Sequence, residues 1–135
     1  STDHNATRKA IGAALGKSPA DLTQEDLEKV EKLDLFGAGI TDISPVAVLT
    51  GLKRLNIFGN KIADLTALTG LTSLEVLYAG ENKIGDLSPL AGLTQLRVLH
   101  LGQNYVSDLT PLAELTAMLS LDLERNRVRY IGVGR

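Results

Sequence analysis

The chain has 135 residues, enough for one domain with a sizeable core, and its formal net charge of −2 disfavours a general nucleic-acid binder. It contains no run of about 18 apolar residues, so the sequence predicts no membrane-spanning helix. The absence of cysteine excludes disulfides and thiol chemistry, and it fits a reducing or an oxidising compartment equally well.

Residues 1–29 predict a helical cap. The stretch 4–15 is rich in alanine and predicts a helix, and Gly16 suits its end. A second helix is expected to begin at Thr23, with the acidic Asp26 three places on, as in a capping box. We expect the two helices to cover the open end of the hydrophobic core that follows, because an uncapped repeat array exposes its leucines.

From residue 30 onward one pattern recurs every 22 residues, and an asparagine marks it. In the unit that begins at Leu52, apolar residues and the asparagine fill L-x-x-L-x-L-x-x-N-x-L, the signature of a leucine-rich repeat. The asparagines are Asn60, Asn82, Asn104 and Asn126, whereas the first unit has Ala38 at this place. We expect the leucines to point inward from a short strand and each asparagine amide to satisfy backbone groups of its own and neighbouring coils.

The second half of each unit repeats as well. An aspartate recurs in phase and is followed two places later by Ser or Thr and then, in most units, by Pro. We expect the carboxylate to bind a nearby backbone N–H and the hydroxyl to cap a short helical turn, whose first position suits proline. The aspartates are Asp42, Asp64, Asp86 and Asp108.

The predicted fold is an α/β leucine-rich repeat solenoid. It has a curved parallel β-sheet on the concave side, short 3₁₀ or helical turns on the convex side and the N-terminal helical cap. Residues 30–135 would hold about five repeats, the last one incomplete, and would form one structural domain with the cap.

Over residues 30–131 the unit L-x-x-L-x-L-x-x-N-x-I-x-D-[IL]-[ST]-P-L-x-x-L-T resembles the internalin-type bacterial leucine-rich repeat family. The same repeat class occurs in a eukaryotic regulator of protein phosphatase-1. The resemblance implies binding to another protein and a secreted or cell-surface bacterial location, although the residues themselves fit a cytoplasmic protein as well. Members of this family bind many unrelated proteins, so the resemblance does not name a partner.

The sequence disfavours catalysis and metal binding. Its two histidines, His4 and His100, lie far apart, and neither a G-x-S-x-G motif nor a metal-ligand spacing is present. The aspartates occur once per coil at the same phase, which favours a structural role over paired catalytic carboxylates. We therefore expect no enzymatic activity, no cofactor and no metal ion.

The concave strand face is the predicted binding surface. Counted from the first leucine of a unit, the third, fifth and seventh positions should point to this face, and they vary between units. Exposed aromatic residues in such a cluster suit the hot spots of a protein interface. An alternative is that Phe36 and Phe58 stack on each other as a packing device. The candidate residues are Phe36, Arg54, Asn56, Phe58, Val76, Tyr78, Val98, His100, Tyr105 and Asp122.

The C-terminal end allows two interpretations. The last unit stops in mid-repeat, has Tyr130 where aspartate is expected, and is rich in arginine. The arginines could solvate a natural terminal coil of a monomer, or the chain could belong to a longer array whose end pairs with another molecule. In the second case the protein would be a structural or assembly piece, joined through residues such as Tyr130 and Ile131.

Overall fold

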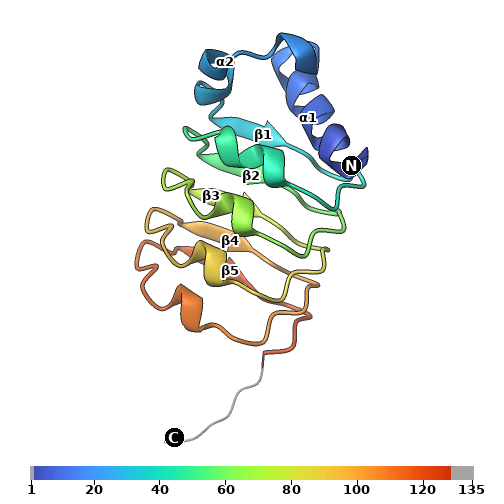
Figure 1. Cartoon of the computed structure of the whole chain (residues 1–135). Helices are drawn as coiled ribbons and strands as arrows, with labels where there is room; N and C mark the ends of the chain where they lie inside the picture. Colours follow the sequence, from blue (N-terminus) through green and yellow to red (C-terminus); the bar gives the residue numbers. More distant parts are fainter. Residues whose placement is uncertain (1, 129–135) are drawn as a thin grey trace, which may run out of the picture.

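The computed structural model describes residues 2–128 and shows five stacked coils with helices at one end (Figure 1). Helix α1 (Thr2–Leu15), a 3₁₀ turn η1 (Pro19–Asp21) and helix α2 (Gln24–Glu28) form that end. The strands are β1 (Lys32–Asp34), β2 (Arg54–Asn56), β3 (Val76–Tyr78), β4 (Val98–His100) and β5 (Ser120–Asp122). The outer 3₁₀ turns are η2 (Ser44–Val48), η3 (Thr66–Leu68), η4 (Ser88–Leu90) and η5 (Thr110–Leu112).

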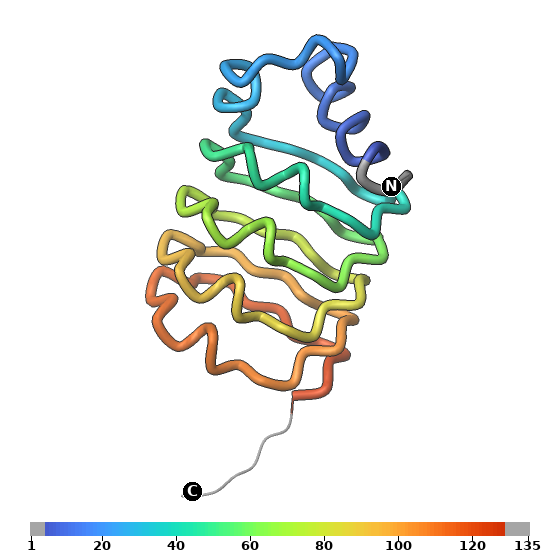
Figure 2. Tube along the Cα trace, in the orientation of Figure 1, coloured from blue at the N-terminus to red at the C-terminus, as the bar shows by residue number. Residues whose placement is uncertain are grey.

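The five strands form one parallel sheet in the order β1-β2-β3-β4-β5. The Cα trace passes from coil to coil in sequence order, from the N-terminal helices at the top of the view to the last coil at the bottom (Figure 2). Equal repeat positions meet across the sheet, so Leu33 pairs with Leu55 and Leu77 with Leu99. These four leucines are at most 4% exposed and belong to one continuous core. The predicted solenoid is therefore confirmed.

The asparagines form the predicted ladder. Asn82 donates from Nδ2 to the carbonyl of Ile57 in the preceding coil at 2.9 Å and to that of Ala79 in its own coil at 3.0 Å. Its Oδ1 accepts from the N–H of Ile62 at 3.0 Å. Asn60, Asn104 and Asn126 make the corresponding bonds. The first unit can have Ala38 because helices, not a coil, precede it.

The prediction that a Ser or Thr hydroxyl caps the outer turns was wrong. The cap position of η3 is Leu65, which makes no side-chain hydrogen bond. Asp64 Oδ1 instead accepts from the N–H of Thr66 at 2.8 Å, and the Thr66 hydroxyl donates to the same oxygen at 2.5 Å. A carboxylate is the stronger acceptor, so the hydroxyl acts as a donor to it. The expected bond from aspartate to backbone is confirmed here and in the other coils.

The N-terminal helices are joined to the first coil. Thr23 and Asp26 form the predicted capping box, with each side chain 3.0 Å from the other residue's backbone nitrogen. The buried hydroxyl of Thr7 in α1 donates to the carbonyl of Asp42 at 2.6 Å, and Ile11 enters the core. A boundary between cap and repeats at residues 29 and 30 stays a prediction from the sequence pattern.

The core is open at the C-terminal end of the described chain. Leu121 is 44% exposed, whereas Leu99, its partner in β4, is fully buried. Leu119 is 81% exposed and Val128 38% exposed. Tyr130 and Ile131 lie outside the described residues, so both interpretations of this end stay predictions.

Candidate partner-binding site

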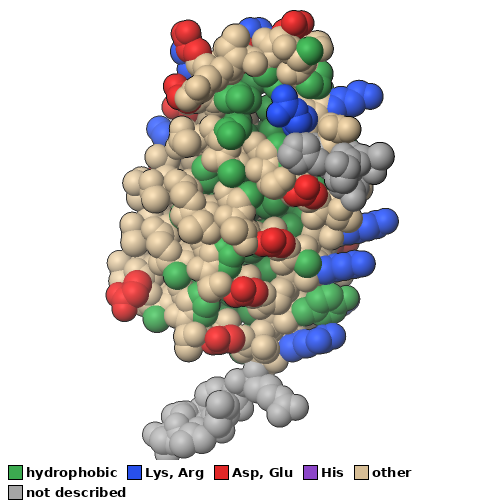
Figure 3. Space-filling view, in the orientation of Figure 1, with side chains coloured by type: hydrophobic (Ala, Val, Ile, Leu, Met, Phe, Trp, Pro, Cys, Tyr) green, Lys and Arg blue, Asp and Glu red, His purple; other side chains and the backbone are tan. Residues whose placement is uncertain are grey.

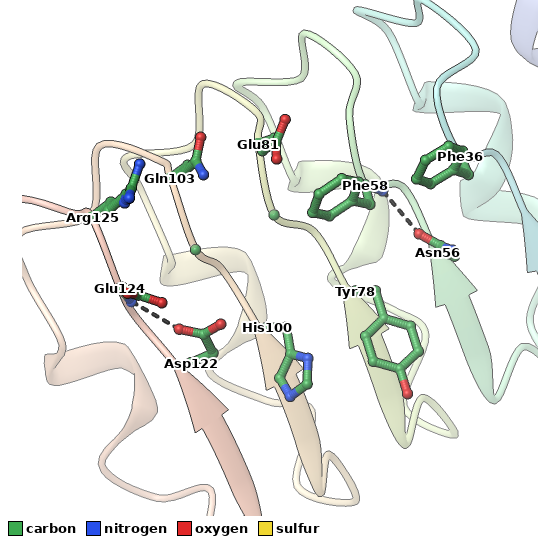
Figure 4. A pocket seen from close by; sticks show the side chains of 12 residues that line it. Phe36, Asn56, Phe58, Tyr78, Glu81, His100, Gln103, Asp122, Glu124 and Arg125 are labelled. Carbon is green, nitrogen blue, oxygen red and sulfur yellow. Dashed lines mark hydrogen bonds between the residues drawn. The ribbon is translucent and has the colours of Figure 1, made fainter.

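Two rows of side chains on the strand face line a hollow of about 500 Å³ (Figure 4). Both rows run across the sheet because parallel strands place equal repeat positions next to each other. The fifth positions contribute Asn56, Tyr78, His100 and Asp122, and the seventh contribute Phe36, Phe58, Gly80, Gly102 and Glu124. The register of the repeat thus converts residues spaced along the sequence into one continuous surface.

An aromatic wall bounds the hollow on the side of β2. The rings of Phe36 and Phe58 are parallel within 2°, with centroids 5.5 Å apart. A β-carbon on Gly80 would lie 2.9 Å from two carbons of the Phe58 ring, so this ring extends over the glycine. The stacking offered as an alternative to binding is present, yet it leaves Phe36 62% exposed.

Tyr78 and His100 lie side by side along the adjoining row. Their ring centroids are 5.2 Å apart and the planes are tilted by 58°. His100 Nε2 is 3.0 Å from the Ser120 hydroxyl, which steadies the imidazole. Gly80 and Gly102 also line the hollow, in the seventh-position row, and have no side chain to fill it.

Acidic residues bound the opposite side. Asp122 Oδ1 accepts from the N–H of Glu124 at 2.9 Å, as Asn56 Oδ1 does from Phe58 at 3.0 Å. The other Asp122 oxygen faces Gly102, 3.4 Å from where a β-carbon of that residue would lie. Within residues 2–128 this second oxygen has no hydrogen-bond partner, so it is available to a ligand.

The rim contains three residues that the sequence analysis missed. Glu81, Gln103 and Arg125 line the hollow and adopt left-handed backbone conformations, with φ of 53°, 57° and 58°. Glycine holds the same place in the first two coils, at Gly37 and Gly59. A non-glycine residue in this conformation costs about 1 kcal/mol. The change from glycine to long polar residues at this position is the signal in the sequence, and it lies one place after the seventh position of the repeat.

Six of the ten predicted residues line the hollow together: Phe36, Asn56, Phe58, Tyr78, His100 and Asp122. Arg54 lines a separate hollow of about 420 Å³ that also touches Tyr78. Val98 is half-buried and does not line the main hollow. The six residues that line the main hollow are therefore the part of the predicted site that forms one continuous surface.

Two predicted residues fall elsewhere. Val76 is only 3% exposed, so little of its side chain is accessible to a partner; it is a short side chain with Arg54 and Val98 in register on either side. Tyr105 is 46% exposed but lies outside the hollow, with the Arg127 guanidinium 4.5 Å from its ring centroid.

The outer face is polar and regular. Acidic side chains run in a line down this face (Figure 3), as one aspartate per coil requires. Among the described residues, no group of three or more His, Asp or Glu side chains is placed to hold a metal ion. In the same part of the chain, no helix is long and apolar enough to cross a membrane.

The parallel strands, the asparagine ladder and the outer 3₁₀ turns define a leucine-rich repeat solenoid, and a family model for leucine-rich repeats in two copies matches residues 72–114. The solved structure of internalin C2 from Listeria monocytogenes is 31% identical, with a TM-score of 0.66, over 93% of this chain and 76% of that one. The chain belongs to the internalin family. Folds of this class are generally non-catalytic interaction modules.

Two longer internalin structures from Listeria monocytogenes are also similar. An internalin designated InlF is 33% identical with a TM-score of 0.79, and the match covers 93% of this chain and 44% of that one. The functional domain of InlJ is 28% identical with a TM-score of 0.84, covering 93% and 27%. The chain thus spans less than half of either protein. The InlJ domain includes a cysteine ladder, whereas this chain has no cysteine. A search of curated proteins gave no significant match.

Proposed function

We propose that the chain is a non-catalytic module that binds a partner protein on its concave strand face. One observation carries this proposal: the exposed aromatic rings and the hollow lie at the fifth and seventh positions of the repeat, where the residues vary between coils. Leucines and asparagines recur from coil to coil as scaffold, whereas the fifth positions that line the hollow differ in every coil and the seventh change from Phe to Gly to Glu along the sheet.

The physical properties of this face favour a protein ligand. Phe36 and Tyr78 expose 62% and 40% of their surface. Tyr78 is the last residue of β3, and Phe36 lies in the turn after β1, where its N–H donates to Asp34 Oδ1 at 2.9 Å. Burying such rings against a partner removes apolar surface from water at little cost in side-chain entropy. Polar groups at the rim surround them, as in the hot spots of known interfaces.

The test compares three versions of the chain as bait. The double variant Phe58→Ala/Tyr78→Ala removes aromatic surface from the hollow, and Tyr105→Ala removes a similarly exposed tyrosine outside it. Proteins captured from extracts are identified by mass spectrometry, and each candidate is then titrated in purified form. Circular dichroism and urea unfolding establish that the variants fold.

We expect a true partner to bind the wild type and Tyr105→Ala with similar affinity. The double variant should bind at least about thirtyfold more weakly, since one hot-spot aromatic contributes about 2 kcal/mol. A partner that binds the double variant as tightly as the wild type would place the interface elsewhere on the molecule.

Assembly through the C-terminal end is the second candidate function, favoured by the exposed Leu119 and Leu121. Leu119→Glu should shift a self-associating protein towards monomer in sedimentation velocity at high concentration. Val48→Glu is the matched control, because Val48 is 51% exposed on an outer turn. A wild-type chain that stays monomeric at all concentrations would exclude this function.

Two more specific proposals concern the same binding module: a phosphatase-regulatory role, and a secreted or cell-surface location. They are supported by the resemblance of the repeat alone. Titration of the purified chain against the catalytic subunit of protein phosphatase-1 tests the former, and fractionation of the source cells tests the latter.

A further inference from the structure

We propose that the hollow above Gly80 and Gly102 receives an arginine side chain of the bound partner. This inference rests on the proposed function, because it names the group that the concave face would recognise. It follows from the shape of the hollow, its charge and the chemistry of its walls.

The shape favours one long side chain. In the seventh-position row, glycines at 80 and 102 separate Phe58 from Glu124. Neighbouring strands are about 4.8 Å apart, so this gap is about 14 Å wide. The Phe58 ring already covers Gly80, so the free space is centred on Gly102, which has Asp122 as its nearest side chain. Phe58 and Glu124 lie at the two ends of this row (Figure 4).

The charge favours a cation. Three carboxylates line the hollow, those of Glu81, Asp122 and Glu124, against the single guanidinium of Arg125. None of these groups forms an ion pair with another described residue. One Asp122 oxygen is held by the Glu124 N–H while the other faces Gly102. A positively charged group above Gly102 would find a pre-oriented, unneutralised acceptor.

The walls favour arginine over lysine or an aliphatic residue. A guanidinium is planar, stacks on aromatic faces and binds a carboxylate in its own plane, whereas an ammonium is a compact and strongly hydrated charge. The three methylenes of an arginine can pack along Phe58 and Tyr78 while the head group reaches Asp122. An aliphatic side chain would instead cover the free Asp122 oxygen without giving it a hydrogen bond.

The rim adds three long polar side chains to the hollow. Glu81, Gln103 and Arg125 keep left-handed backbone conformations where the first two coils use glycine, and all three surround this hollow. These residues are placed to contact partner groups that flank the arginine.

The experiment is a ¹H–¹⁵N NMR titration of the labelled chain with N-acetylarginine amide. N-acetylcitrulline amide is the matched control, since it has the same stem and a planar head group but no charge. We expect saturable shifts of the Gly80 and Gly102 amide signals, with the arginine compound binding at least about threefold more tightly than the citrulline compound. Asp122→Asn keeps the oxygen that accepts from the Glu124 N–H, and should abolish this difference.

Three results would overturn the proposal: no shift at the two glycines, equal binding of the two compounds, or an undiminished preference for arginine in Asp122→Asn. None of these decides whether a protein binds the face. If the chain shows no preference for arginine but Phe58→Ala/Tyr78→Ala loses a partner, the proposed function stands and this inference is excluded. A partner indifferent to the double variant would remove the proposed function itself.

Discussion

The ring of Phe58 occupies the space that a side chain on Gly80 would need, with two ring carbons 2.9 Å from the position of a β-carbon there. Each residue lies two positions after a strand, Phe58 after β2 and Gly80 after β3, and the two occupy equal positions in neighbouring coils. An aromatic residue at position 58 therefore depends on glycine at position 80. This dependence fixes where the Phe36–Phe58 stack ends and the hollow begins (Figure 4).

Gly80→Ala should displace the Phe58 ring and loosen its stacking on Phe36. The closest clash is with two ring carbons of a side chain that can rotate, and the added carbon would also lie 3.3 Å from the carbonyl oxygen of Gly102, so we expect a loss of stability of about 1 kcal/mol. Ring-current shifts of the two phenylalanines in NMR spectra measure the displacement, and partner affinity should fall with it. Gly70→Ala, at a place with open space around it, is the control. Unaltered phenylalanine resonances would contradict the prediction.

Asn82→Ala should destabilise the solenoid by roughly 2–4 kcal/mol, because it removes bonds to buried backbone groups in two coils. Asn126→Ala should cost less, since its ladder bonds are only partly buried. Urea unfolding followed by circular dichroism measures both free energies. Equal losses for the two variants would show that burial does not set the contribution of the ladder.

Thr7→Val should weaken the attachment of α1 to the first coil. The variant keeps the shape of the buried side chain but leaves the Asp42 carbonyl without the hydroxyl donor, at a cost of about 1–2 kcal/mol. Thr7→Ser keeps the hydroxyl donor but lacks the methyl group, so comparing the two variants distinguishes the contribution of the hydrogen bond from that of methyl packing. Hydrogen exchange of the α1 amides should accelerate in Thr7→Val more than in Thr7→Ser; the reverse order would assign the attachment to packing.

Acid should destabilise the protein below about pH 4. The hydroxyl and then the backbone N–H of Thr66 lower the pKa of Asp64, and backbone hydrogen bonds are the main cause of lowered pKa values at Asp86 and Asp108. The Lys17 ammonium, followed by Thr23, lowers the pKa of Asp26 to about 2. Folded pKa values below the ordinary 3.8 contribute stability above that pH, and this contribution is lost as the pH falls through the folded values.

The triple variant Asp64→Asn/Asp86→Asn/Asp108→Asn tests this assignment. Asparagine keeps an oxygen that accepts from the backbone N–H but does not titrate. Urea unfolding at a series of pH values between 5 and 2 should show a shallower loss of stability for the variant. If both proteins lose stability with the same slope, the outer aspartates are not the groups responsible.

The sequence predicted which residues meet, because a fixed period places equal positions side by side. The neighbours Phe36 and Phe58, and Tyr78 and His100, follow directly from it. The accessibility of Val76 did not follow, because exposure depends on how far a side chain rises above its flanking neighbours. The outer caps were missed for a different reason: each turn begins one residue earlier than expected, at a cap such as Leu65. The N–H groups of Leu68 and Thr69 therefore bond to the carbonyls of Leu65 and Thr66, and the Thr66 hydroxyl donates to Asp64 instead.

The asparagine ladder also has a consequence for how such a chain can evolve. Its bridging bonds span fixed separations, 20 residues from the Ile62 N–H to Asn82 and 25 residues from Asn82 back to Ile57. A tandem duplication of one whole repeat recreates every one of these bonds at the new junction, because each unit carries both halves of the bridge. The gene can therefore lengthen coil by coil without repair of the scaffold, and each copied coil starts with free positions on the strand face at which new specificity can be selected.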